Sequence, residues 1–436
     1  MATILANALL VDIDPPNVAA GELRIDGGLI AERGPRVTRD ANDSVVDCGG
    51  AVVFPGFVNG HAHLYSALAA GMPAPPKSPG NFVEILEYVW WRLDRGLDAE
   101  SIAMSGRIGA LDALRCGTTT MIDHHASPDC IENSLDDLER GIADVGLRAV
   151  LCYEATDRNG RAGRDAGVEE NRRYLDKFRK KPSRQFAGLV GAHASFTLED
   201  DSLDALADVA ERYGSGVHIH VAEDPADEAH CREKHGQSLI DRLAGHGLLT
   251  SKAVYAHGTH LDQAAIDRLG EAGVTLAHNP RSNMNNGVGY TPVAQFRCPV
   301  MLGTDGIGGD MFTEAKHAWF KSCDAHAGIA PSRIVEMLAT SARRASAALG
   351  VTLGKLEVDA VADIVLTSFR PATPLTGANF AGQFIFAMGS QHVTDVMIDG
   401  RWALRDRQVT TCNEPDIRQE SRRVASGLWE RMAKIP

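Results

Sequence analysis

Between about residue 55 and residue 358, eight short apolar runs alternate with amphipathic stretches of helical length. The runs are VVFPGFVNGHAH, TTTMID, RAVLCYE, AGLVGAH, GVHIHVAE, AVYAHG, VTLAHN and PVMLGTD. The stretches between them include ESIAMSGRIGALDALRCG and DSLDALADVAERYG, which both end in Gly, a frequent residue just after a helix. Continuous apolar strands alternating with helices indicate a parallel sheet that is buried on both faces. Eight such units predict an α/β fold of the (β/α)8 barrel type, a TIM barrel.

Short strand-like runs also stand at both ends of the chain. TILANALLVDI, ELRIDGGLIAERG and SVVDCGG lie near the start, and ADIVLTSF, HVTDVMIDG and RWALRDRQVTT lie near the end, with Asp-Gly turns in both groups. Two separate tiny β domains would each struggle to bury a core. We therefore predict one small β-sandwich-like domain formed by both termini. The predicted segments are 1–54 and 359–436 for this domain with a C-terminal helix, and 55–358 for the barrel.

Composition limits the class of partner. The 436 residues carry 44 Lys plus Arg against 57 Asp plus Glu, a net charge of −13, which disfavours nucleic acid because phosphate binding needs a basic surface. No apolar stretch reaches the roughly 18 residues that a membrane span needs. The eight cysteines are scattered singly, and the N-terminus lacks the basic start of a signal peptide. We expect reduced thiols, a cytoplasmic location and a small free molecule as the partner.

Nearly every predicted barrel strand ends in a residue that can titrate or bind a metal. In chain order these residues are His61 and His63, Asp123, His124 and His125, Glu154, His193, His220 and Glu223, His257, His278, and Asp305. The carboxyl ends of the strands meet on one face of a TIM barrel, and active sites form there. The sequence therefore predicts one site built from residues far apart in the chain.

The His-x-His pair points to a metal. Side chains two apart on a strand project to the same side, so His61 and His63 can offer two imidazoles to one ion. In HIHVAE, His220 lies nearer the mouth than His218, so we predict that His220 is a ligand and that His218 is a hydrogen-bonded core residue. Asp305 in GTDG is the fourth predicted ligand; the alternative for an Asp-Gly pair is a turn cap.

Two further residues suit proton transfer. Glu223 lies at the rim, three residues past a predicted ligand, where its carboxylate can reach a metal-bound water. His257 can be a further ligand, a hydrogen-bond partner of the bound hydroxide or a structural residue, and we favour the second role. The fourth strand ends in His193 rather than in a Lys that could bridge two metals, which indicates one ion.

Substrate contacts are predicted from position alone. Trp90 and Trp91 follow the first strand and can stack on a flat ring. Because neighbours on a helix do not share a face, we expect at most one of them to stack, and we select Trp90. Glu154 and Arg158 follow the third strand and can bind polar groups, and His193 stands beside them at the fourth.

The motifs PGFVNGHAH, HIHVAE, YAHG, NPRSN and GTDG, in this order, resemble the amidohydrolase superfamily, in the branch that holds cytosine and guanine deaminases and triazine hydrolases. HLYSAL, WWRLDR, IDHHASP and ATDRNG are similar to SsnA-type aminohydrolases within it. The resemblance implies one divalent metal, Zn²⁺ or Fe²⁺, on His61, His63, His220 and Asp305. It also implies Glu223 as proton shuttle, His257 as the group that polarises water, His193 as a substrate contact, and a homodimer.

The predicted function is that of a metal-dependent aminohydrolase, a deaminase. Hydroxide formed from water on the metal attacks the carbon that carries an exocyclic amine of a purine, pterin, pyrimidine or triazine-like ring, and ammonia leaves. A chlorohydrolase or a cyclic amide hydrolase using the same site is the alternative. A non-catalytic barrel that serves as a scaffold is a third hypothesis, although all the predicted metal ligands are present.

Overall fold

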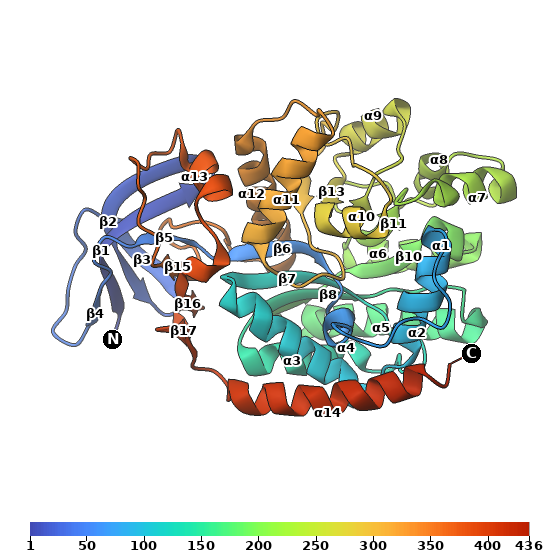
Figure 1. Cartoon of the computed structure of the whole chain (residues 1–436), viewed down its shortest axis with the longest axis horizontal. Coiled ribbons are helices and arrows are strands. Elements are labelled where there is room, and N and C mark those ends of the chain that lie inside the picture. Colours follow the sequence, from blue (N-terminus) through green and yellow to red (C-terminus); the bar gives the residue numbers. More distant parts are fainter. Residues whose placement is uncertain (436) are drawn as a thin grey trace.

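The computed structural model describes residues 1–435, and the eight predicted barrel strands are present in it (Figure 1). They form two parallel sheets, in the orders β6-β7-β8-β9 and β10-β11-β12-β13-β14, because the run AGLVGAH divides into two short strands. The bounds are β6 (Phe57–Ala62), β7 (Thr118–His125), β8 (Arg148–Tyr153), β9 (Phe186–Gly188), β10 (Val190–Ala194), β11 (Val217–Val221), β12 (Val254–His257), β13 (Thr275–His278) and β14 (Val300–Leu302).

The two sheets meet at both of their edges near the carboxyl ends of the strands. Single parallel bridges join Ala62 to Asp305 and Ala155 to Ala192. The Thr304 amide also donates to the carbonyl of His61, at 2.8 Å. Within each sheet the strands pair continuously, and isolated bridges join the two sheets into a ring. The predicted barrel fold is confirmed.

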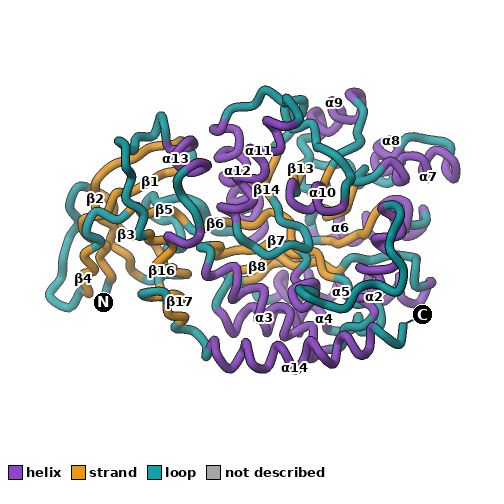
Figure 2. The backbone as a smooth tube through the Cα atoms, in the orientation of Figure 1, coloured by secondary structure: helices purple, strands orange, loops and turns teal. Residues whose placement is uncertain are grey.

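Helices surround the strands (Figure 2). In chain order they are α3 (Ala99–Arg115), α4 (Ser134–Val145), α5 (Gly160–Lys180), α6 (Asp200–Tyr213), α7 (Pro225–His235), α8 (Leu239–Gly245), α9 (Gln263–Ala272), α10 (Pro280–Asn286), α11 (Met311–Asp324) and α12 (Pro331–Leu349). Local sequence sets their ends: Asp98 and Ser101 form a reciprocal capping box at the start of α3. Gly214 takes the left-handed conformation after α6, with φ 63°.

A long excursion separates β6 from α3. It contains the 3-10 helix η1 (Leu64–Leu68), the Pro-rich loop, α1 (Phe82–Ile85), the π-helical turn η2 (Leu86–Trp90) and α2 (Trp91–Arg95). Asn81 caps α1 by accepting from the Glu84 amide at 3.0 Å. The excursion carries the two adjacent tryptophans to the mouth of the barrel.

Both ends of the chain build one nine-stranded sheet, as predicted for the composite domain (left in Figure 1). β5 pairs with β1 and also with β15, which joins the N-terminal and C-terminal segments. The boundaries predicted near residues 54 and 359 stay predictions. The strands are β1 (Thr3–Ile13), β2 (Pro16–Asp26), β3 (Leu29–Gly34), β4 (Ser44–Asp47), β5 (Val52–Pro55), β15 (Ile364–Thr367), β16 (Val393–Ile398), β17 (Arg401–Arg405) and β18 (Gln408–Val409).

The last part of the chain returns to the barrel. After α13 (Phe380–Phe386) and η4 (Ser390–His392), helix α14 (Glu414–Met432) lies along α3 (red in Figure 1). The Trp429 indole donates to the carbonyl of Leu68 at 3.0 Å, and Arg431 donates to the carbonyl of Gly96 at 2.6 Å. α14 therefore holds both ends of the excursion. No helix within residues 1–435 has the length and apolarity of a membrane span.

Candidate active site at the mouth of the barrel

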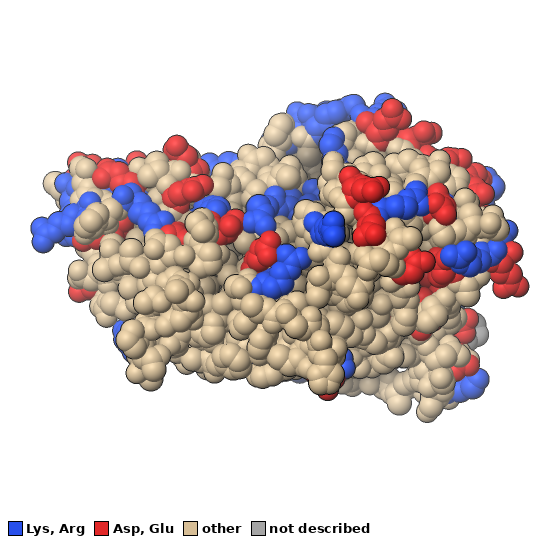
Figure 3. Space-filling view, turned by 90° about the horizontal axis from the view of Figure 1, so that it is seen from above, with Lys and Arg blue, Asp and Glu red and all other residues tan. Residues whose placement is uncertain are grey.

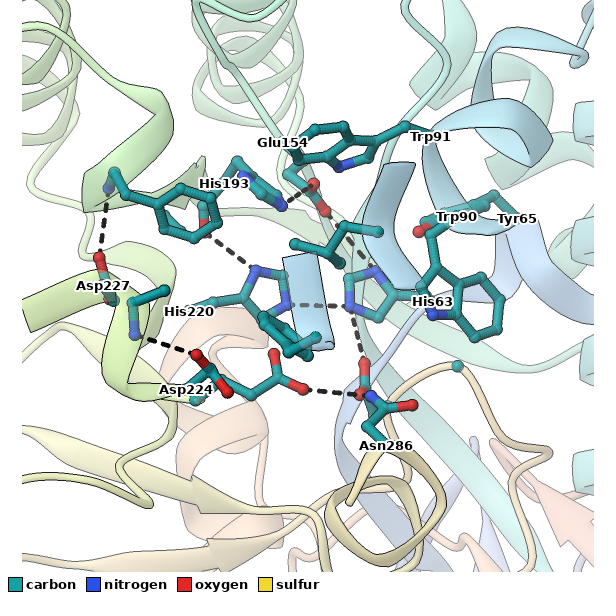
Figure 4. Close-up of a pocket in the computed structure, with 18 residues that line it drawn as sticks. His63, Tyr65, Trp90, Trp91, Glu154, His193, His220, Asp224, Asp227 and Asn286 are labelled. Carbon is teal, nitrogen blue, oxygen red and sulfur yellow. Dashed lines mark hydrogen bonds and ion pairs between the residues drawn. The ribbon is translucent and has the colours of Figure 1, made fainter. Parts of the chain in front are cut away.

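Four of the predicted residues converge at the carboxyl ends of β6, β11 and β14. The potential ligand atoms of His61, His63, His220 and Asp305 all lie within 4.8 Å of one another. Nε2 of His63 is 3.0 Å from Nε2 of His220 and 2.9 Å from Oδ1 of Asp305 (Figure 4). Nε2 of His61 is 3.4 Å from the same carboxylate oxygen. Strands far apart in sequence thus place three imidazoles and one carboxylate around a common point.

The other nitrogen of each imidazole is held from outside the cluster. Nδ1 of His63 and Nδ1 of His220 each donate to a backbone carbonyl, at 2.6 and 2.9 Å. Nδ1 of His61 is 2.8 Å from Nε2 of His218, the residue predicted to be a hydrogen-bonded core histidine. Such outer hydrogen bonds fix the tautomer and orient a ligand toward its metal.

The donor set fits a divalent cation. Nε2 of His61 is fully buried and has no hydrogen-bond partner. Burial lowers the pKa of His61 to about 4, which keeps this imidazole neutral as a ligand must be. Three inward-facing nitrogens and a carboxylate oxygen are the ligand types that Zn²⁺ accepts in catalytic sites. Metal binding by these four residues remains a proposal that the geometry supports.

Opposite this cluster, His257 is fixed with a free nitrogen pointing inward. Its Nδ1 donates to Oδ1 of Asn283 at 2.9 Å, so Nε2 carries a lone pair. That Nε2 lies 3.4 Å from Oε2 of Glu223 and 3.9 Å from Oδ2 of Asp305. The hydroxyl of Ser282 donates to Oδ2 of Asp305 at 2.5 Å, which leaves Oδ1 turned toward the imidazoles. Asn283 and Ser282 are therefore positioning residues.

Glu223 sits at the turn that follows β11. Burial raises the pKa of its carboxyl to about 7, near the value that suits a general acid or base at neutral pH. Asn286 donates to its Oε1 at 3.2 Å.

Three non-glycine residues at the mouth have a positive φ: 49° at Ala222, 75° at His257 and 55° at Asp305. Left-handed backbone at three non-glycine residues concentrates strain at the mouth, as functional sites often do.

An aromatic pocket opens above this centre (Figure 4). Its apolar walls come from Tyr65, Phe82, Leu86, Trp90, Trp91, Phe196 and part of Ala194. Both tryptophans line it, and the expectation that at most one of them stacks on the substrate ring stays a prediction. Trp90 ends the π-helical turn η2, and Trp91 begins α2.

The predicted polar substrate contacts divide into two groups. Glu154 and His193 line the pocket. Arg158 does not: it forms an ion pair with the buried Asp94, and its guanidinium lies 4.9 Å from the centre of the Trp91 ring. Substrate binding by Arg158 stays a prediction, and in this structure its contacts are with Asp94 and Trp91.

Several pocket residues were not found from the sequence. Asn286, at the end of α10, touches Glu223, and Phe82 and Leu86 come from the excursion. Asn286 follows Asn283 of NPRSN by three residues, and this one-turn spacing is a sequence signal that could have found it. The excursion residues carry no such signal because they follow no strand end.

The model of the amidohydrolase family matches residues 52–403. The chain belongs to the amidohydrolase family. This confirms the resemblance that the motifs indicated. The family model spans the whole barrel together with strands of the composite sheet.

Named relatives of this amidohydrolase include 5'-deoxyadenosine deaminase of Methanosarcina mazei, which is 27% identical over 440 residues, covering 98% of this chain and 99% of the relative. Among solved structures, a zinc-bound adenosine deaminase from Xanthomonas campestris superposes with a TM-score of 0.84 at 22% identity, covering 99% of both chains. Zinc-bound atrazine chlorohydrolase from Arthrobacter aurescens TC1 gives 0.81 at 19%, covering 97% of this chain and 100% of that one. These likenesses confirm the barrel with its composite β domain.

Proposed function

We propose that this amidohydrolase is a metal-dependent deaminase that releases ammonia from an amino-substituted N-heterocycle. The observation that carries the proposal is the meeting of two sets of groups at one point. His61, His63, His220 and Asp305 offer a ligand set, and two groups face it: Glu223, which lines the pocket, and the buried His257. Aromatic walls above them suit a flat ring.

The proposed roles follow from the atoms. A divalent metal, Zn²⁺ being our first choice and Fe²⁺ the alternative, supplies Lewis-acid activation of a water molecule when bound. His257 Nε2, with its lone pair turned inward, accepts a hydrogen bond from that water and orients it. Glu223 takes the water proton and delivers it to the ring nitrogen beside the attacked carbon. Asp305 or Glu223 then holds the proton that the departing amine needs.

The leaving group favours deamination over dechlorination. An amine leaves as ammonia only when it is protonated, whereas chloride leaves without a proton. Glu223 is buried with a pKa raised to about 7, so it can both accept and return a proton near neutral pH. Relatives named as deaminases of 5'-deoxyadenosine and adenosine make aminopurines the first ring class to test.

A screen for ammonia release tests the proposal. The metal-loaded enzyme is offered aminopurines, aminopterins, aminopyrimidines and aminotriazines beside their chloro analogues, and ammonia and chloride are measured separately. We expect ammonia from at least one ring class, loss of turnover after chelation and recovery with Zn²⁺ or Fe²⁺. Chloride without ammonia, ring opening without ammonia, or no turnover at all would overturn it.

We also propose a homodimer in the cytoplasm. Phe320 on α11 and Phe386 at the end of α13 are large apolar side chains that are 54% and 61% exposed, and their ring centres are 6.2 Å apart. The face seen in Figure 3 includes a wide area with few charged side chains. All eight cysteines are unpaired, which suits a reducing compartment. Light scattering of the purified protein would measure the assembly state.

A further inference from the structure

A second hollow lies at the end of the barrel opposite the active site. Its lining includes Gly216, which precedes β11, and Lys252, which precedes β12, so it sits at the amino-terminal ends of these strands. Its volume is about 370 Å³. No residue of the described chain lines both this hollow and the active-site pocket, so the proposed chemistry makes no use of it. Its apolar walls come from Leu175, Phe178, Ala187, Leu189, Ala347 and Ala348.

The charged side chains that line this hollow are all cations. They are Arg344 of α12, Lys252 and Arg179 of α5, and no Asp or Glu is among the lining residues, which all belong to the described part of the chain. Asp176 neutralises Arg179, at 2.7 Å. Nζ of Lys252 donates to the carbonyl of Gly214 at 2.8 Å rather than to a carboxylate. On a chain with a net charge of −13, this hollow is a local site of positive potential that attracts anions.

Arg344 is the cation whose charge the protein leaves without a partner. Its Nη2 donates to the carbonyl of Lys252, and its Nε is buried with no hydrogen-bond partner. Burial lowers the pKa of this guanidinium to about 10, and no carboxylate of the described chain raises that pKa in return. The buried arginines Arg148 and Arg242, by contrast, each pair with an aspartate. Because arginine stays charged in proteins, a guanidinium buried without a counter-ion costs free energy that a bound anion would recover.

We propose that this hollow binds a small organic anion, in which a carboxylate or phosphate group is carried on a flat apolar body. The anionic group lies against Arg344 and Lys252, since a guanidinium donates well to either kind of oxyanion. The apolar body packs on Phe178 and the aliphatic walls beside it. This binding needs no metal and no residue of the active site, so it is independent of the proposed deamination.

Calorimetric titration of the metal-loaded enzyme tests the proposal with four probes. Phenyl phosphate and benzoate carry an anionic group on a flat apolar body, inorganic phosphate lacks the body, and benzyl alcohol lacks the charge. We expect phenyl phosphate or benzoate to bind at least about 10-fold more tightly than the last two, and the tighter of the pair identifies the anionic group. Arg344→Met should weaken that binding by about 10-fold or more, as the loss of a hydrogen bond to a charged group does.

Because a bound metal can also take an anion, the substitutions decide which site the probes occupy. Arg343→Met is the matched control: it removes one charge from the neighbouring position of α12, where Arg343 pairs with Asp14 and lies outside the hollow. It should bind the probes as the wild type does. Without a probe, Arg344→Met should unfold at no lower temperature than the wild type, because it removes a buried charge that has no partner.

Four outcomes would overturn the inference. They are an affinity for the aromatic anions that Arg344→Met leaves unchanged, no binding of either aromatic anion, equal affinity for benzyl alcohol or inorganic phosphate, and an Arg344→Met protein that does not fold. The last would show that the protein already compensates this guanidinium. None of these outcomes bears on ammonia release, which is measured without the probes.

Discussion

At the scale of single residues, Glu223 is the group whose removal should separate chemistry from metal binding. Glu223→Gln keeps the size of the side chain and its contact with Asn286 but cannot carry a proton. We expect turnover to fall by about 10²-fold or more, the usual contribution of general acid–base catalysis. Metal content, measured by plasma mass spectrometry, should stay at the wild-type level because Glu223 is outside the four-residue ligand set.

Glu228→Gln is the control for that substitution. It makes the same chemical change on α7, where Glu228 pairs with Arg232 and does not line the pocket. Its turnover should equal that of the wild type. If Glu223→Gln kept full activity, or lost its metal, the role of Glu223 as the proton shuttle would be refuted.

His218 should act on the metal from a distance. It touches no substrate, but its Nε2 lies 2.8 Å from Nδ1 of His61 and orients that imidazole. We expect His218→Ala to weaken metal affinity by about 10- to 100-fold, the range found for groups that hold a metal ligand in place. Competition with a fluorescent chelator measures the affinity. The exposed His317 on α11, replaced by Ala, should leave it unchanged, and equal affinities for both variants would contradict the role of His218.

At the scale of elements, two helical glycines should respond in opposite ways to alanine. In α4, a Cβ on Gly141 would lie 2.0 Å from the carbonyl oxygen of Ala103 in α3, so the two helices would have to separate. We expect Gly141→Ala to lower the free energy of unfolding by about 1–3 kcal/mol, as overpacking does. In α5, the nearest atom to a Cβ on Gly163 is 3.4 Å away, so Gly163→Ala should raise stability by about 0.5–1 kcal/mol. Thermal unfolding distinguishes the two, and changes of the same sign would contradict this view of α3–α4 packing.

The elements also show how far the sequence could predict the site. The alternation of apolar runs with helical stretches predicted the eight strands. The titratable residues at the strand ends predicted that His61, His63, His220 and Asp305 lie together, because parallel strands of a barrel end on one face. The excursion between β6 and α3 obeys no such rule. Its position depends on α14, more than 300 residues later, through contacts such as Trp429 to Leu68. The surroundings of the two tryptophans and the pairing of Arg158 with Asp94 of the excursion could not be predicted, because these contacts are fixed only by tertiary packing.

At the scale of the whole molecule, one buried arginine joins the barrel to the composite β domain. Arg148 begins β8, at the end of the barrel away from the mouth, and is 1% exposed. Its Nε donates to Asp363 at 2.8 Å and its Nη2 to Asp399 at 2.9 Å, both from the C-terminal part of the chain. Because the amino-terminal face of a TIM barrel serves stability rather than catalysis, this junction should matter for folding and not for chemistry.

We expect Arg148→Met to cost about 3–5 kcal/mol in the free energy of unfolding, measured in urea, since it leaves the buried Asp363 without its cation. Arg107→Met breaks an ion pair with Asp144, which is 42% exposed, and should change stability by no more than about 1 kcal/mol. Adding Asp363→Leu to Arg148→Met should recover part of the loss, because the unpaired charge is then gone. The folded fraction of Arg148→Met should keep its metal and its turnover. Similar stabilities for the Arg148 and Arg107 variants would show that this ion pair does not join the two parts of the molecule.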